Sequence, residues 1–280
     1  MRFPGPILRA GVLAALTSWS CAAPTVVTTI DRAEAGDSRA RVARREAEDH
    51  WARRSEEREL RAAIAGWRLA VELDDADAGA YADLARALFL LADNFAAKDE
   101  ARRSFHEGAA AADRGLRALS PAIERLRNLG VDVDRAVAGA GVRAAPLVYW
   151  WALCTIRWAE LDGWSTAAGT YEDVFRAMEL VRSLDPEVDR GGPDRFFGSA
   201  RAEAPAIAGG DLARSRQHFA RALAIDATSL ETRLQLARHY ARRAGDTALY
   251  QRTLREIELL AAASPEDELA KKKARSLPAR

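Results

Sequence analysis

The feature that most constrains the fold is an almost uninterrupted helical pattern from Asp37 to the C-terminus. This stretch is rich in Ala, Leu, Arg and Glu, which are strong helix formers, and its apolar residues recur with helical spacing. The only β-branched run covers residues 25–30, and no second run is available to pair with it. We therefore predict an all-α protein of about ten helices, in which residues 25–30 form either a tether or a short extended piece.

Two parts of the chain repeat one spacing of small, aromatic and small residues. The two sets are Ala63, Trp67 and Ala70, and Ser215, Phe219 and Ala222. Each set is followed by the large and small residues of a further helix, namely Tyr81, Leu84, Ala85 and Leu88, and Leu236, Ala237 and Tyr240. This is the pattern of tetratricopeptide units, whose stacking buries a continuous apolar core and leaves a concave side for a ligand or partner. We predict a TPR-like α-solenoid over residues 37–280.

Capping residues mark several helix boundaries. Ser120 and Ser264 each precede a proline, a combination that favours a capped helix start. Thr228 has the spacing of a capping box, and Asp211 after two glycines is expected to cap the following helix. Between residues 120 and 210 the repeat length is broken, so we predict an irregular middle section.

Residues 147–161 form a segment that is apolar on every face of a helix, which predicts a central, buried helix. Its aromatic side chains, with one more close behind, are candidates for a surface that binds an apolar ligand: Tyr149, Trp150, Trp158 and Trp164. The alternative is that these rings only fill the core between irregular helices.

The N-terminus has the pattern of a bacterial lipoprotein signal. Arg2 and Arg9 precede an apolar run that is too short to span a bilayer, and the run ends at Ser20 and Cys21. We predict a signal peptide over residues 1–21, lipidation at Cys21 and a tether over residues 22–36. Ordinary cleavage, or an N-terminal helix belonging to the fold, are the alternatives.

Composition argues against several functions. The formal net charge is +1, and it becomes −1 without residues 1–21, so a nucleic-acid partner is not expected. The four histidines and two cysteines form no metal-ligand pattern, and the Gly-Ala-Gly-Val-Arg-Ala motif at residues 139–144 has no strand before it. Carboxylates alternate with arginines along helix faces. We expect no cofactor, no metal and no enzymatic activity, although an envelope hydrolase stays a minor alternative.

A block within residues 191–223 carries a family resemblance. It contains Gly-Gly-Pro-Asp-Arg-Phe-Phe-Gly at residues 191–198, Ala-Pro at 204–205, Gly-Gly-Asp at 209–211 and a helix at 215–223. With the closing helix around residues 268–274, it resembles the TatT family, the tetratricopeptide lipoproteins associated with TRAP transporters. Phe196 and Phe197 are adjacent in this block, so one can enter the core while the other faces the concave side, and both join the four rings above as candidates for binding a ligand or partner.

The resemblance implies a function. It suggests an accessory component of a TRAP-type uptake system that docks a periplasmic substrate-binding protein and contacts a hydrophobic small molecule. It also implies a homotrimer on the periplasmic side of the bacterial envelope, held by a lipid anchor in a membrane, with the outer membrane favoured. The alternative function is a TPR lipoprotein scaffold for outer-membrane assembly or secretion.

Overall fold

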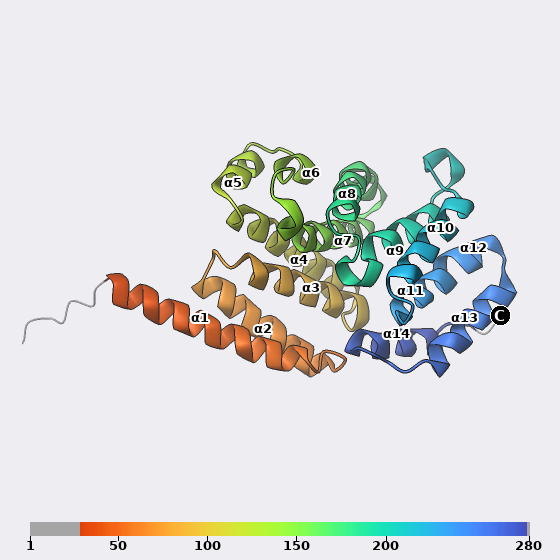
Figure 1. The fold of residues 1–280 in the computed structure, drawn as a ribbon, viewed down its shortest axis with the longest axis horizontal. Coiled ribbons are helices and arrows are strands. Elements are labelled where there is room, and N and C mark those ends of the chain that lie inside the picture. The colour runs from red at the N-terminus through yellow and green to blue at the C-terminus, as the bar shows by residue number, and fades with distance from the viewer. Residues whose placement is uncertain (1–28, 279–280) are drawn as a thin grey trace, which may run out of the picture.

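The structure, a computed structural model, describes residues 29–278, with side chains described from residue 38 onward. Within this range the chain is all-α and has no strand, which confirms the predicted all-α class (Figure 1). Its α-helices are α1 (Thr29–Trp51), α2 (Glu57–Leu73), α3 (Ala78–Asn94), α4 (Lys98–Ala118), α5 (Pro121–Asn128), α6 (Val133–Ala136), α7 (Ala145–Asp162), α8 (Trp164–Leu184), α9 (Val188–Glu203), α10 (Leu212–Ile225), α11 (Leu230–Gln235), α12 (Arg242–Ala244), α13 (Thr247–Leu259) and α14 (Pro265–Arg275). The shorter elements are the 3₁₀ helices η1 (Gly141–Ala144) and η2 (Ala206–Ala208), and the π-helix η3 (Leu236–Ala241).

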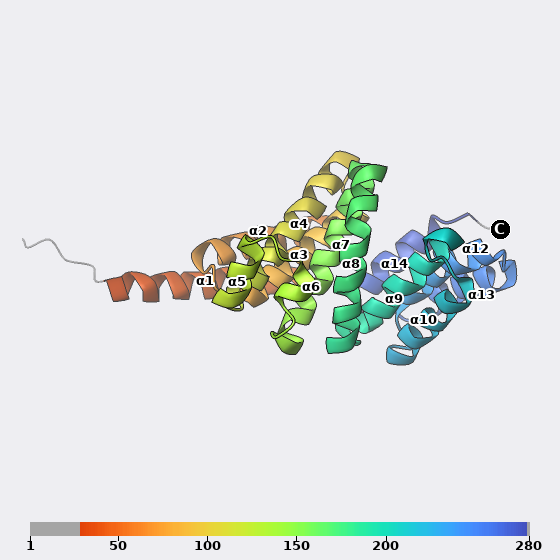
Figure 2. The same ribbon diagram turned by 90° about the horizontal axis from the view of Figure 1, so that it is seen from above.

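Neighbouring helices in the chain pair with one another: α1 with α2, α3 with α4, α7 with α8, and α9 with α10 (Figures 1 and 2). Helix α1 begins at Thr29, so the last two residues of the β-branched run are helical, ahead of the expected start at Asp37. The proposed signal peptide and Cys21 lie outside the described residues. The predicted number of about ten helices covers the long helices but leaves out short ones such as α6 and α12.

Small residues let α1 and α2 approach closely. Ala43 and Ala47 face α2 and are buried, and a Cβ added at Gly66 would lie 2.9 Å from the Cβ of Ala47. On the same helix Trp67 is buried against Trp51, with 5.2 Å between ring centroids. The small residues thus set the helix spacing, and the large ring fills the space beside it.

The second repeat set packs in a similar way between α9 and α10. The Ser215 hydroxyl donates a hydrogen bond to the carbonyl of Gly198 at 2.7 Å. A Cβ at Gly198 would lie 2.9 Å from the ring of Phe219. The following helix differs from expectation, because it contains the π-helix η3, in which Ala237 and Tyr240 are buried and Leu236 is half-buried.

Most of the predicted caps are confirmed. Ser120 accepts a hydrogen bond from the amide of Ala122, and Ser264 and Asp211 cap α14 and α10. The prediction for Thr228 is wrong, because Ser229 caps α11 by accepting from the Thr232 amide at 3.2 Å. The Thr228 hydroxyl instead donates to Asp226 at 2.7 Å. Two adjacent residues could each supply the cap, and the spacing alone favoured the wrong one.

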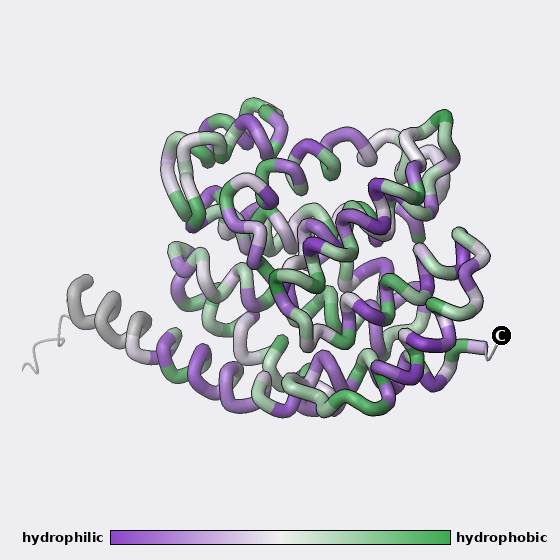
Figure 3. Tube along the Cα trace, turned by 45° about the vertical axis from the view of Figure 1, so that its right-hand side comes forward, coloured by the Kyte–Doolittle hydropathy of each residue, from purple (hydrophilic) through white to green (hydrophobic). Residues whose placement is uncertain are grey.

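The irregular part of the middle section is the segment of α5, α6 and η1, after which α7 and α8 form a regular pair. Helix α7 packs against α3, α4, α8 and α9, and nine of its residues are buried, which confirms its predicted central position. Polar and apolar residues alternate along the helices in Figure 3, as expected of helices that bury one side. No helix within residues 29–278 combines the length and apolar content of a membrane span.

The C-terminal helix lies beside the N-terminal helices. Helix α14 packs against α11 and α13, and it also lies beside the end of α3 and the turn between α1 and α2 (Figure 1). This arrangement brings together side chains about 200 positions apart in sequence, and it builds the polar centre described next.

Candidate functional site

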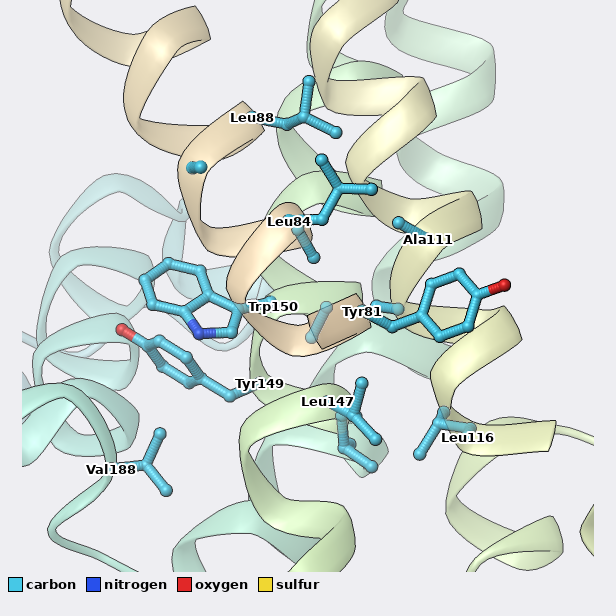
Figure 4. Packing of buried hydrophobic residues seen from close by; sticks show 14 of the residues in the cluster. Tyr81, Leu84, Leu88, Ala111, Leu116, Leu147, Tyr149, Trp150 and Val188 are labelled. Carbon is cyan, nitrogen blue, oxygen red and sulfur yellow. The ribbon is translucent and has the colours of Figure 1, made fainter. Parts of the chain in front are cut away.

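Two of the predicted ligand-binding residues, Tyr149 and Trp150, lie in the core. Their side chains are 1% and 5% exposed, and their rings meet edge to face with centroids 4.8 Å apart. Figure 4 shows Trp150 beside α3, with the ring of Tyr149 next to it and Val188 of α9 on the far side of Tyr149. They occupy the centre of the molecule, closed to solvent, because this part of α7 packs against α3, α4 and α9.

The hydroxyl of Tyr149 joins a buried ion pair. It donates to Asp189 Oδ2 at 3.0 Å and accepts from Arg195 Nη2 at 3.2 Å, while Arg195 and Asp189 also contact each other directly. Burial, and then the charge of Asp189, raises the pKa of Tyr149 well above its usual value of 10.0. The phenol is therefore a fixed hydrogen-bonding group, with no role as a base at neutral pH.

The start of α9 is held in an uncommon backbone conformation. Asp189, Arg190 and Gly191 have φ angles of 50°, 60° and 83°, in the left-handed region. For the two residues with side chains this costs on the order of 1–3 kcal/mol each. The following glycine is sterically required, because a Cβ at Gly192 would lie 2.3 Å from the Tyr149 oxygen. The glycines of the family block thus permit positive φ at Gly191 and a close approach of α9 to α7 at Gly192.

The C-terminal helix adds a second acid to this centre. Glu266 on α14 accepts hydrogen bonds from Arg54 Nε at 2.8 Å and Arg86 Nη2 at 2.7 Å. Arg86 also lies 3.8 Å from Asp189. Burial acts to raise the pKa of Glu266, but Arg54 and Arg86 outweigh it and lower this pKa below its usual value. We call the set of Arg54, Arg86, Asp189, Arg195 and Glu266 the central ionic cluster.

Tryptophan rings flank this cluster. The guanidinium of Arg54 lies 4.4 Å from the ring centroid of Trp51, and that of Arg86 lies 5.0 Å from Trp51 and 5.8 Å from Trp150. Arginine stacked on tryptophan gains a cation–π interaction in addition to its ion pairs. The centre therefore combines fixed charges with aromatic surface.

Phe196 and Phe197 form a separate aromatic group with α8. Phe175 lies 5.3 Å and 5.4 Å from them, between ring centroids. Phe197 is 1% exposed and stacks on His218, whereas Phe196 is half-buried. One ring thus enters the core and its neighbour lies nearer the surface, as the spacing predicted.

The remaining two predicted residues lie near the turn between α7 and α8. Trp158 is half-buried beside His106, with centroids 5.3 Å apart, and Trp164 is 86% exposed. The six aromatic candidates therefore fall into three places, and the structure does not bring them into one pocket.

The reactive side chains of the described region serve packing and ion pairs. Cys154 is buried and free, and burial raises the pKa of its thiol far above the usual value. His218 and Arg221 both contact the buried Asp194, at 2.7 Å and 3.0 Å. No group of three metal-ligating side chains occurs among residues whose side chains are described.

Two open grooves lie on the C-terminal half. The larger, of about 590 Å³, is lined by Leu212, Ala213, Arg216, Gln217, Ala220, Tyr240 and Ala244. The smaller, of about 530 Å³, lies near Asp194 and Arg221. Close in sequence to the larger groove, Ile207 on η2 is 99% exposed. Sequence reasoning missed this surface and the central ionic cluster, because both consist of residue types common on any helical surface, although Arg195 and the groove residues Arg216, Gln217 and Ala220 lay within the family block.

The architecture defines an all-helical protein of paired helices without a recognisable catalytic centre in its described part. The profile of the family described as TAtT, TRAP transporter T-component, matches residues 90–280, and the chain belongs to this family. The resemblance noted from the sequence is thereby confirmed. No curated protein matches the chain. Membership supports an accessory role in a TRAP system at the bacterial envelope, and this family is not a class of enzymes.

Proposed function

We propose that the protein is a non-enzymatic accessory component that docks the periplasmic substrate-binding protein of a TRAP system. The observation that carries this proposal is the family match over residues 90–280, which includes α9, η2 and α10. We further propose that the paired helices form a TPR-like solenoid. Such arrays commonly present extended surfaces to protein partners.

The η2 loop and the larger groove support a docking role. Ile207 projects into solvent from a loop whose shape is fixed by hydrogen bonds from Gly210 N to the Pro205 carbonyl at 3.0 Å and from Arg201 Nη1 to the Gly209 carbonyl at 2.7 Å. Leu212 beside it is 39% exposed. A rigid loop that presents an apolar side chain loses little entropy on binding.

Binding measurements with Ile207→Asp test this proposal. The chain without residues 1–21 should bind the TRAP substrate-binding protein, and Ile207→Asp should weaken binding by at least about tenfold, because an apolar anchor becomes charged. Leu129→Asp, at a leucine directly after α5 that is 79% exposed, is the matched control and should bind normally. Absence of a complex at roughly 50 µM, equivalent to about −6 kcal/mol, would contradict docking.

The anchor and the assembly are further parts of the proposal. Lipidation at Cys21 would hold the protein on the periplasmic side of the outer membrane, and the mass of the mature protein extracted from membranes tests it: a chain without acyl groups would exclude the anchor. The assembly would be a homotrimer, which light scattering of the purified protein tests; a monomer at all concentrations would exclude it.

We also propose that an apolar solute contacts the aromatic residues. Trp158, Trp164 and Phe196 are accessible at least in part, whereas Tyr149, Trp150 and Phe197 are covered in this conformation. An apolar probe should quench tryptophan emission. Quenching that is unchanged in both Trp150→Ala and Trp158→Ala would exclude the aromatic site.

A further inference from the structure

The junction between the N-terminal half (α1 to α8) and the C-terminal half (α9 to α14) has two unlike sides. On one side the contact is mainly aromatic: the Phe175 ring lies against Phe196 and Phe197, and Gly192 lies against Tyr149, whose hydroxyl also hydrogen-bonds to Asp189 and Arg195. The ring contacts are insensitive to charge. They keep α8 and α9 together at the point where the chain passes from one half to the other.

The other side of the junction is held mainly by charges. Glu266 of α14 contacts Arg54 in the turn after α1 and Arg86 of α3. Lys273 of α14 contacts Asp93 near the end of α3. The backbone of α14 packs closely against α11 and α13, within its own half. Leu269 contributes one buried apolar side chain to the large core.

The connection between α8 and α9 has the features of a hinge. It leads into the left-handed residues Asp189, Arg190 and Gly191 at the start of α9, directly before Gly192, which lies against Tyr149. Hinges commonly consist of a few residues at the ends of elements, and strained backbone persists where the surrounding contacts hold it. Here Asp189 is held by Arg195 and Tyr149, both at the junction.

We propose that α14 is an ionic clasp that holds the two halves closed, and that its release lets them separate about the connection between α8 and α9. Release frees Arg54 and Arg86, which Glu266 contacts in the closed form and which lie over the Trp51 ring. Arg86 also lies 5.8 Å from the ring centroid of Trp150, which is 5% exposed in the closed form. That the freed aromatic surface serves a solute rests on the proposed function; the clasp itself does not.

Glu266 is the residue of α14 whose substitution should weaken the clasp most. Its side chain is 17% exposed, and it offsets Arg54 and Arg86, which are 12% and 31% exposed. Removing one partner of a buried ion pair leaves the other charges without compensation. Glu266→Gln should therefore favour the open form, in which both guanidinium groups regain water.

A zero-length cross-link measures closure directly. A carbodiimide couples a touching carboxylate and amine to an amide, so the wild-type chain should give a cross-link between Asp93 and Lys273, detected by mass spectrometry. In Glu266→Gln the yield should fall by about threefold or more, which corresponds to a closed population that drops from nearly all molecules to about a third of them, a shift of the equilibrium on the order of 100-fold. Glu258→Gln is the matched control, because Glu258 pairs with Arg275 of α14 within the same half. A yield in Glu266→Gln equal to that of wild type would overturn the proposal.

A second measurement avoids any substitution. Amide hydrogen exchange of the unaltered chain should become several-fold faster in α14 when salt rises from about 0.05 M to about 0.5 M, because screening weakens partly exposed ion pairs. Exchange in α2 should stay the same. Equal exchange of α14 at both salt concentrations would contradict an ionic clasp, whether or not the substrate-binding protein binds.

Discussion

The two halves of the molecule are stabilised by different means. One large apolar cluster runs from Ala43 through α7, mostly in the N-terminal half, and takes in Val188, Phe197 and Leu269 of the C-terminal half. The other apolar clusters of the C-terminal half are small, such as Leu230, Leu234, Ile257, Ala270 and Ala274 around α11 and α14. Helices of one chain can thus differ in what stabilises them: one group depends on apolar burial, and the other depends more on polar contacts.

Asp267 is the main polar contact of the C-terminal half. Its side chain is fully buried, and it accepts hydrogen bonds from Arg190 Nη1 at 3.0 Å and from the amides of Leu230 and Ala263, each at 3.1 Å. Ser264 also donates to it. One carboxylate thus joins α9, α11, the α13–α14 connection and α14, where apolar area is limited.

The largest effect is expected for Trp67→Ala in the N-terminal half. The side chain is 1% exposed, so its removal leaves a cavity and should lower the free energy of unfolding by about 4 kcal/mol. Urea unfolding measures this. Leu69→Ala, at a side chain 42% exposed on the same helix, should change stability by less than about 0.5 kcal/mol. Similar losses for both variants would show that the large cluster is not the source of stability.

A somewhat smaller and more local effect is expected for Asp267→Asn. The substitution leaves Arg190 without one of its two acids and should cost about 3 kcal/mol, chiefly in α11 and α14. Amide exchange of these helices should quicken while that of α2 stays slow. Asp246→Asn, which caps α13 at an exposed site, is the control and should be nearly neutral because Asn also caps well. Uniform loss of protection over the whole chain would remove the distinction between the halves.

Helical class, the buried α7 and most caps were predictable because each depends on local pattern: spacing of apolar residues, or a hydroxyl before proline. The contact of Arg54 with Glu266 was not, since 212 positions separate the two residues. The left-handed turn at Asp189 and Arg190 was also hidden, because neither residue type signals positive φ strongly. For the candidate site, the sequence identified the aromatic residues. It did not predict that they lie in three separate places.

The smallest effect concerns acid stability. Burial acts to raise the pKa of Asp226, but Arg190 and Thr228 outweigh it and lower this pKa from 3.8 to about 2. A lowered carboxyl pKa stabilises the fold above the unfolded value, and this stabilisation is lost as pH falls from about 4 toward 2. Asp226→Asn should therefore show a shallower loss of stability over this range, measured by thermal unfolding. If the variant lost stability as steeply as wild type when the pH falls, Asp226 would contribute little to the pH dependence of stability.

The central claim is that this family member acts by docking a substrate-binding protein. Affinity purification from native membranes, with the partners identified by mass spectrometry, tests it most directly. We expect a TRAP substrate-binding protein to be the main partner, and we expect this partner to be lost from the Ile207→Asp variant. Recovery instead of outer-membrane assembly or secretion proteins, or of the folded chain without any partner, would contradict it.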